Sequence, residues 1–233
     1  MPAGADSEAQ EKNRKAGGFM ENRMIKFYAK DSSRVALHAV PGHFATSHSH
    51  INYYIDLTSL KIRANEAMGV ASALAARFTD TMTVDTIVCM DGTEVIGAFL
   101  AQEFEKRSHM STTNTHETIY IVSPEYHTNN QMIFRDNNLP AIKGKHVLLL
   151  LATTTTGETI RRSLECVQYY GGIMEGVCSL FSTVKEVEGY PVESIFSEED
   201  LPGYAAYTQK DCPFCKKGHR LEAMVNGFGY SKL

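Results

Sequence analysis

The chain has 233 residues, of which 43% are hydrophobic and 21% charged, and its net charge is −4. These values are ordinary for a globular protein with one main domain and a sizeable core. The negative charge offers no electrostatic basis for binding nucleic acid or an anionic membrane. No apolar run approaches the roughly 18 residues that span a bilayer. We therefore expect no nucleic-acid and no membrane partner.

Residues 1–22 are polar and lack an apolar stretch, so we expect a disordered tail rather than a secretory signal. A reducing cytoplasm is then the expected compartment. The five cysteines are an odd number, and Cys89, Cys166 and Cys178 lie inside apolar segments. Reduced thiols buried in the core are the simplest interpretation of these three residues.

Short apolar segments alternate with helical patterns along most of the chain. Strands are expected at 52–57, 84–90, 117–123, 146–152 and 173–182, and helices at 64–78, 95–107 and 158–170. We expect the helices to bury residues at helical spacing, namely Met68, Ala71, Ala75 and Phe78, then Val95 and Phe99, then Ile160, Leu164 and Val167. This alternation predicts an α/β fold with an open, mainly parallel sheet and helices on both faces.

The pattern also divides the chain into segments. After the tail at 1–22 we expect an N-terminal segment at 23–62, the α/β core at 63–200 and an irregular C-terminal appendage at 201–233. In open sheets of this class, ligands bind beyond the carboxyl ends of the strands. That rule directs attention to the junctions at 91–94, 124–145 and 151–159. The second of these is polar and long, which is typical of a functional or mobile loop.

The junction between the strand at 146–152 and the helix after it is rich in threonine. Gly157 can adopt backbone angles that let successive N–H groups converge, and the helix N-terminus adds partial positive charge. Threonine hydroxyls supply further donors, so this turn is expected to bind a phosphate monoester. The alternative is that Thr156 only caps the helix. The candidate residues are Thr153, Thr154, Thr155, Thr156, Gly157, Glu158 and Thr159.

The stretch GKHVLLLLATTTTGETI, followed by a helix and YYGGIMEGV, resembles the phosphoribosyl-pyrophosphate signature of the type I phosphoribosyltransferases. Two further stretches are similar to the orotate phosphoribosyltransferase branch of that family. TSHSHINYYIDLTSLK resembles its substrate-hood segment, and DCPFCKKGHRLEAMVNGFGYSKL resembles a Cys-Pro-x-Cys-x-x-Gly tail found in a subset of its members. VDTIVCMDGTEVIGAFLAQEF stands where the family has a pyrophosphate-contacting loop.

The resemblance covers about residues 44–233 and implies transfer of ribose 5-phosphate from phosphoribosyl pyrophosphate to a nitrogenous base. It also implies Mg²⁺ bound with that substrate, and a homodimer with active sites at the subunit boundary. The threonine turn would hold the 5′-phosphate. The pyrophosphate loop would be Asp91, Gly92, Thr93 and Glu94, and the hood residues near the base would be His48, His50, Tyr53 and Tyr54.

Two departures from the family pattern concern the chemistry. Leu151 and Ala152 stand where the family has two acidic residues that accept hydrogen bonds from the ribose hydroxyls. The loop after Ser123 lacks the lysines of the family's catalytic loop, and only His127 and Arg135 are basic between Ser123 and Asn138. Arg135 is a possible substitute, because a guanidinium grips phosphate oxygens in a fork. A phosphate-binding protein without catalysis therefore remains an alternative to a working transferase.

Cys212 and Cys215 have the spacing of a metal knuckle, with His219 as a third candidate ligand. A structural zinc site needs four ligands, and no second pair of cysteines is present. His48 and His50 would lie on one face of a strand, but the sequence places no cysteine or carboxylate beside them. We therefore expect no metal site, and we expect small apolar thiols that pack the appendage onto the protein. A redox role and an interaction module built on this tail are weaker alternatives.

Overall fold

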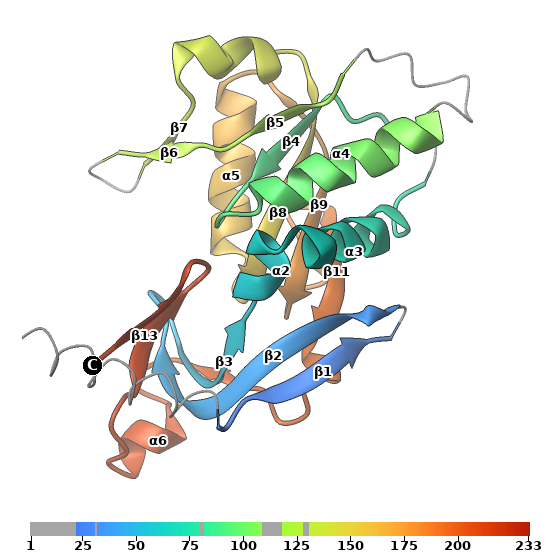
Figure 1. The fold of residues 1–233 in the computed structure, drawn as a ribbon. Coiled ribbons are helices and arrows are strands. Elements are labelled where there is room, and N and C mark those ends of the chain that lie inside the picture. The colour runs from blue at the N-terminus through green and yellow to red at the C-terminus, as the bar shows by residue number, and fades with distance from the viewer. Residues whose placement is uncertain (1–21, 31, 80–81, 109–117, 128–130) are drawn as a thin grey trace, which may run out of the picture. The chain divides into compact units, whose positions relative to one another are not determined.

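A computed structural model describes residues 22–30, 32–79, 82–108, 118–127 and 131–233 (Figure 1). The chain divides into two units, one formed by residues 1–27, 36–56 and 203–233 and the other by residues 28–35 and 57–202. All but the last residue of the expected tail lies outside the described part of the chain. Among the described residues, no helix is long and apolar enough to cross a membrane.

The second unit is built on one open sheet, with the strand order β10-β11-β9-β8-β4-β5. Its strands are β4 (Thr86–Cys89), β5 (Tyr120–Val122), β8 (His146–Thr154), β9 (Ile173–Ser182), β10 (Glu186–Val187) and β11 (Tyr190–Ser197). The pairs β11–β9, β9–β8, β8–β4 and β4–β5 are parallel, and only the edge strand β10 is antiparallel. The predicted open, mainly parallel sheet is confirmed.

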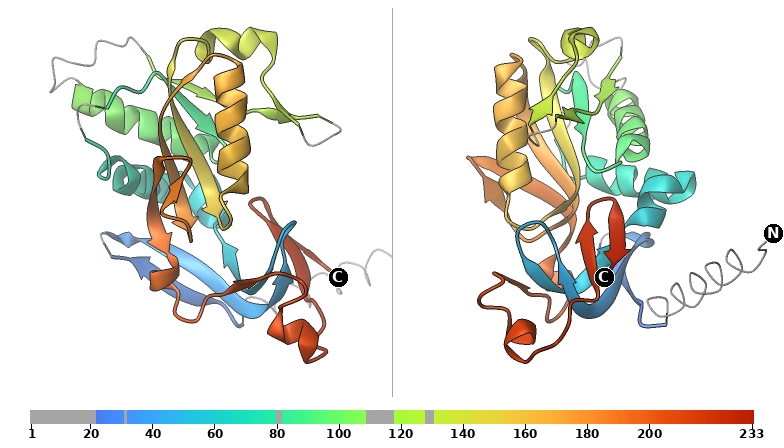
Figure 2. Two further views of the ribbon diagram at one scale, coloured as in Figure 1. Left: turned by 180° about the vertical axis from the view of Figure 1, so that it is seen from behind. Right: turned by 90° about the vertical axis from the view of Figure 1, so that its left-hand side faces the viewer.

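Helices cover both faces of this sheet. They are α2 (Thr58–Ile62), α3 (Ala64–Ala75), α4 (Glu94–Ser108) and α5 (Glu158–Tyr169), and a 3₁₀ turn, η2 (Glu198–Asp200), follows β11. The edge-on view of Figure 2 shows α5 on one face and α3 with α4 on the other. Ile160, Leu164 and Val167 of α5 are buried, as the helical spacing predicted.

The buried faces of α3 and α4 match the prediction only in part, since Ala71 and Ala75 are buried as expected. Met68 and Val95 are 49% and 41% exposed, and α3 ends at Ala75, before Phe78. The residues actually buried in the two helices are Ala67, Val70, Ala71, Leu74 and Ala75, then Ile96, Leu100, Ala101 and Phe104. Two overlapping apolar stripes fit each of these sequences, and periodicity alone does not choose between neighbouring stripes.

The segment expected as a loop, Pro124–Lys145, is partly regular. It contains the antiparallel strands β6 (Glu125–Tyr126) and β7 (Met132–Ile133) and a 3₁₀ helix, η1 (Asp136–Ala141). Met132, Phe134 and Ile142 are buried in the core cluster on the α5 side of the sheet. These anchors hold the segment to the core although many of its other residues are polar.

The first unit contains most of the second sheet, whose order is β12-β3-β2-β13-β14, with β1 paired to β2. Its strands are β1 (Ile25–Ala29), β2 (Ser32–Ala45), β3 (His50–Asp56), β12 (Ala206–Tyr207), β13 (Ala223–Asn226) and β14 (Gly229–Lys232). The C-terminal residues, expected to be irregular, thus supply three strands and the helix α6 (Pro213–Lys216). These elements are only two to four residues long, too short for a periodic pattern to reveal them.

Candidate functional site

Two of the predicted loops emerge next to each other in the second unit. Strands β4 and β8 are parallel neighbours, with Cys89 opposite Leu150, so their carboxyl ends lie at the same edge of the sheet. The backbone N–H of Ala152, near the carboxyl end of β8, donates a hydrogen bond to the Asp91 carboxylate. The expected pyrophosphate loop therefore borders the strand that leads into the threonine turn.

The threonine turn begins α5 without a side-chain cap. Gly157 is the N-cap residue and has a left-handed φ of 76°. Thr156 contributes only a long contact, with its Oγ1 3.5 Å from the backbone nitrogen of Glu158. The first N–H groups of a helix lack partners within the helix, and the helix dipole places partial positive charge there. These donors are oriented for an anion, and capping by Thr156 is a weak explanation of the turn.

The threonines of this turn differ in exposure. Thr156 and Thr159 are exposed and Thr155 is partly buried, so their hydroxyls line an open turn. The backbone carbonyl of Thr155 accepts a hydrogen bond of 2.7 Å from Thr183 Oγ1, which holds the backbone of the turn. Thr154 is only 4% exposed, and its hydroxyl is enclosed without a hydrogen-bond partner in the described part of the chain. We therefore expect this hydroxyl, unlike those of Thr156 and Thr159, to make no contact with a ligand in the turn.

Glu158 places a carboxylate at the start of α5. Arg161 and Arg162, one turn further along the helix, each donate to it at 2.9 and 3.0 Å. Arg161 also bonds Glu188 at 2.9 Å. The two guanidinium groups offset the negative charge of Glu158, so the field beside the turn is not repulsive to an anion.

The Asp91 loop is a strained turn with a perturbed acid. Asp91 and Gly92 have φ values of 57° and 77°, and the Lys61 ammonium donates to the Asp91 carbonyl at 2.8 Å. Burial raises the pKa of the Asp91 carboxyl, while the Lys61 charge and the Ala152 N–H oppose that rise. Thr93 is buried and its hydroxyl is used within the fold, since it donates to the Met90 carbonyl at 2.8 Å. Glu94 is exposed at the start of α4.

Leu151 and Ala152, the residues that replace the acidic pair, are fully buried. Leu151 belongs to the core cluster between β8 and α5. Their aliphatic side chains extend the strand interior, and neither offers a polar group to a ligand. The Asp91 carboxylate on the neighbouring loop accepts a hydrogen bond from the Ala152 backbone at this strand end.

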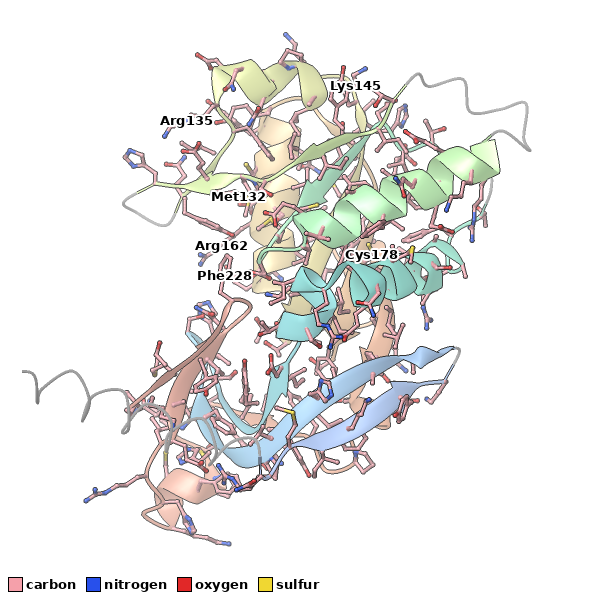
Figure 3. The ribbon with its side chains drawn as sticks, in the orientation of Figure 1. Met132, Arg135, Lys145, Arg162, Cys178 and Phe228 are labelled. Carbon is pink, nitrogen blue, oxygen red and sulfur yellow. The ribbon has the colours of Figure 1, made fainter. Side chains whose placement is uncertain are left out.

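The basic residues of the long segment, Arg135 and His127, make hydrogen bonds to other residues of that segment. Arg135 forms a forked salt bridge with Glu125, with nitrogen–oxygen distances of 2.9 and 2.7 Å. The backbone N–H of His127 donates to the Gln131 carbonyl at 2.9 Å. A cavity of about 480 Å³ lies between this segment and α5, where Met132 and Arg162 both contribute to its lining (Figure 3).

The hood residues of the first unit fall into different environments. Tyr54 is buried in the core of that unit and its ring meets Tyr230 edge-on, whereas Tyr53 is only partly buried. His48 is exposed in the turn before β3, so it does not share a strand with His50 as expected. His50 is buried, and Cys215 Sγ lies 3.3 Å from its Nδ1. The expectation that no cysteine approaches this histidine is therefore wrong.

The core cysteines match the expectation of inert thiols. Burial raises the pKa of Cys89 to about 12 and that of Cys166 to about 11. The pKa of Cys178 is also raised far above its usual range, first by burial. A thiol with such a pKa holds its proton at neutral pH and is a poor nucleophile.

No protein-family model matches the chain, and no curated protein matches its sequence. Among solved structures, it is similar to UMP synthase from Leishmania donovani, with a TM-score of 0.51 and 18% identity over 70% of this chain and 34% of that protein. Orotate phosphoribosyltransferase from Aeropyrum pernix gives a TM-score of 0.49 and 15% identity over 70% of this chain and 90% of that one. A phosphoribosyltransferase from Corynebacterium diphtheriae gives 0.48 and 19% over the same shares. At these identities the likeness concerns the fold.

Proposed function

We propose that the chain is a phosphoribosyltransferase of the orotate type, which transfers ribose 5-phosphate from phosphoribosyl pyrophosphate to a nitrogenous base. The observation that carries the proposal is the uncapped start of α5 at Gly157, beside the hydroxyls of Thr155, Thr156 and Thr159. Backbone N–H groups and neutral hydroxyls at a helix N-terminus suit a phosphate monoester. UMP, the product named by the Leishmania relative, carries such a group.

The adjoining Asp91 loop suits the pyrophosphate end of the same substrate. Mg²⁺ prefers oxygen ligands and is commonly held by one or two carboxylates together with substrate phosphates. Asp91 and Glu94 offer such carboxylates at one loop, where burial and, to a lesser extent, the Glu94 charge raise the pKa of the Asp91 carboxyl. Asp91 and Glu94 would hold Mg²⁺, and the bound ion would supply positive charge for the pyrophosphate leaving group. Following the resemblance, we also propose that the protein acts as a homodimer.

The alternative function is a nucleotide- or sugar-phosphate-binding protein without transfer. The burial of Leu151 and Ala152 favours it, because these positions supply no hydrogen bond to the ribose hydroxyls. A hydrogen bond to a charged group contributes about 1.5–3 kcal/mol, and removal of one preorganised electrostatic partner costs about 10²–10³ in rate. The salt bridge of Arg135 to Glu125 also leaves that guanidinium less available as a substitute for the family's lysines.

The test measures pyrophosphate release from phosphoribosyl pyrophosphate and Mg²⁺ with orotate and a panel of other bases. Nucleoside monophosphates are titrated in parallel. Turnover within about tenfold of an ordinary enzyme, roughly 10 s⁻¹, supports the transferase and excludes the binder. Binding of a monophosphate without turnover supports the binder. Failure of both ligands to bind contradicts both functions and the phosphate assignment of the threonine turn.

A further inference from the structure

Four metal-ligating side chains meet inside the first unit, which we call the His/Cys cluster. It consists of His43 on β2, His50 at the start of β3, and Cys212 and Cys215 at the start of α6. Each side chain offers one ligand atom, and all of these atoms lie within 4.8 Å of one another. The cluster joins residues up to 172 positions apart in the chain. Nothing in the proposed phosphate chemistry uses it.

The spacing of the ligand atoms matches a tetrahedral metal site. Around a Zn²⁺ ion with bonds of about 2.0–2.3 Å, neighbouring ligand atoms lie about 3.3–3.8 Å apart. His43 Nε2 lies 3.2 Å from His50 Nδ1 and 3.4 Å from Cys212 Sγ. Cys215 Sγ lies 3.7 Å from His43 Nε2 and 3.3 Å from His50 Nδ1. These four separations are close to those expected around one tetrahedral centre.

Contacts of His43 with its neighbours orient this side chain as a metal ligand. His43 Nδ1 lies 3.1 Å from the backbone carbonyl of His219. A carbonyl only accepts, so Nδ1 carries the proton and the lone pair of Nε2 points into the cluster. Such a second hydrogen bond is the usual support of a metal-bound histidine. Phe214 stacks on the His43 ring, with centroids 5.2 Å apart. His219, named above as a third candidate ligand, thus contributes only its backbone carbonyl.

Ordinary hydrogen bonds do not explain this arrangement equally well. His43 Nε2 has a single lone pair, yet a histidine nitrogen and two sulfurs surround it at 3.2–3.7 Å. Thiol-to-histidine bonds would form separate pairs, with no reason for all four atoms to converge. The two cysteines are not joined by a disulfide. His43, His50 and Cys212 are buried, and Cys215 lies at the surface, which gives an ion a route of entry.

We propose that the His/Cys cluster binds one structural Zn²⁺ ion. Two thiolates and two imidazoles in a tetrahedron are a donor set typical of zinc, and four protein ligands leave no open position for catalysis. The ion ties the short helix α6 to the strands β2 and β3. Because α6 has only four residues and the buried core of this unit is small, the metal supplies cohesion that apolar burial does not.

The first experiment measures metal content in the purified full-length chain by plasma mass spectrometry. The expected result is about one zinc per chain. Zinc-edge X-ray absorption should then show two sulfur and two nitrogen neighbours. A folded protein that contains no zinc, and that takes up none when Zn²⁺ or Co²⁺ is added after chelation, overturns the proposal. A bound metal with a different first shell, such as oxygen ligands only, also overturns it.

Variants separate the proposed ligand set from its neighbours. His50→Gln and Cys215→Ser should lose zinc, whereas His48→Gln and His219→Gln should keep it, because His48 is exposed and His219 acts through its backbone. If the ligand variants do not fold, cobalt substitution of the unmutated protein answers the same question. Tetrahedral cobalt with thiolate ligands shows charge-transfer absorption, and its absence from cobalt-loaded protein counts against the cluster. Loss of zinc in His219→Gln but not in His50→Gln would also refute it.

Discussion

The threonine turn and the His/Cys cluster are two candidate sites built in opposite ways. The turn occupies seven consecutive residues, Thr153–Thr159, between a strand and a helix that belong together in sequence. The cluster takes His43 from one end of the chain and Cys215 from the other. A contiguous site is visible in the sequence because its strand, turn and helix each leave a local pattern. A site assembled across a sheet becomes visible only when the strand pairing is known.

The largest expected effect comes from breaking the cluster. Cys212→Ser removes a fully buried ligand, and loss of a structural metal should lower the free energy of unfolding by about 4 kcal/mol or more. Urea denaturation followed by circular dichroism measures this change. The matched control is Cys178→Ser, which alters a buried thiol outside the cluster and should leave zinc bound. Equal zinc content in both variants would show that Cys212 is no ligand.

A second large effect concerns the strand end before the turn. Leu151→Asp combined with Ala152→Asp places two carboxylates where both side chains are fully buried. An uncompensated buried charge costs about 3–5 kcal/mol, so this variant should unfold at much lower urea concentration. Leu151→Met is the control and should cost under about 1.5 kcal/mol. A stable double variant would mean that the strand end opens to water.

Gly157→Ala tests the shape of the turn itself. The left-handed backbone costs about 1–2 kcal/mol with a side chain, and the added Cβ would also lie 2.8 Å from Val187 Cγ2. Gly189→Ala is a matched control, because Gly189 has a φ of 82° with nothing near its Cβ position. Thermal unfolding should therefore show a larger loss for Gly157→Ala. Equal losses would show that the contact with Val187 relaxes freely.

The smallest expected effect is that of Arg135→Ala. Its partner Glu125 is exposed, and the guanidinium holds the pKa of that carboxyl below its usual range. An exposed ion pair contributes little because solvent screens it, so the unfolding free energy should hardly change. A double-mutant cycle with Glu125→Ala measures the coupling. A marked loss of phosphoribosyl pyrophosphate affinity in Arg135→Ala would instead show that the arginine leaves Glu125 to bind substrate.

Much of the second unit could be predicted from the sequence, because its strands and helices are long enough to show a period. The exceptions are instructive. Overlapping apolar stripes misplaced the buried face at Met68 and Val95, since adjacent residues offer equally plausible stripes. Apart from β3, which the expected strand at 52–57 overlaps, most of the first unit escaped prediction for another reason. Its C-terminal strands are two to four residues long, and their stability comes from pairing with distant strands.

The two candidate sites differ in predictability in the same way as the two units. The threonine turn is predicted as a phosphate site from its local pattern, and the structure adds that the Thr154 hydroxyl is enclosed. His43 was missed as a ligand, because no spacing rule links it to a cysteine pair near the other end of the chain. The sequence did carry a signal, namely the single cysteine pair in Cys212-Pro-Phe-Cys215 together with four histidines between residues 38 and 50. Such a half-site indicates that the remaining ligands come from elsewhere in the fold.

The central claim, that the threonine turn binds a phosphate monoester, is tested most directly by calorimetric titration of UMP into three proteins. The unmutated chain should bind. Thr156→Val should weaken binding by about tenfold or more, because it loses a hydrogen bond to a charged group. Thr154→Val should bind as the unmutated chain does, because its hydroxyl is enclosed. Absence of binding by the unmutated chain, or equal weakening in both variants, would contradict the account.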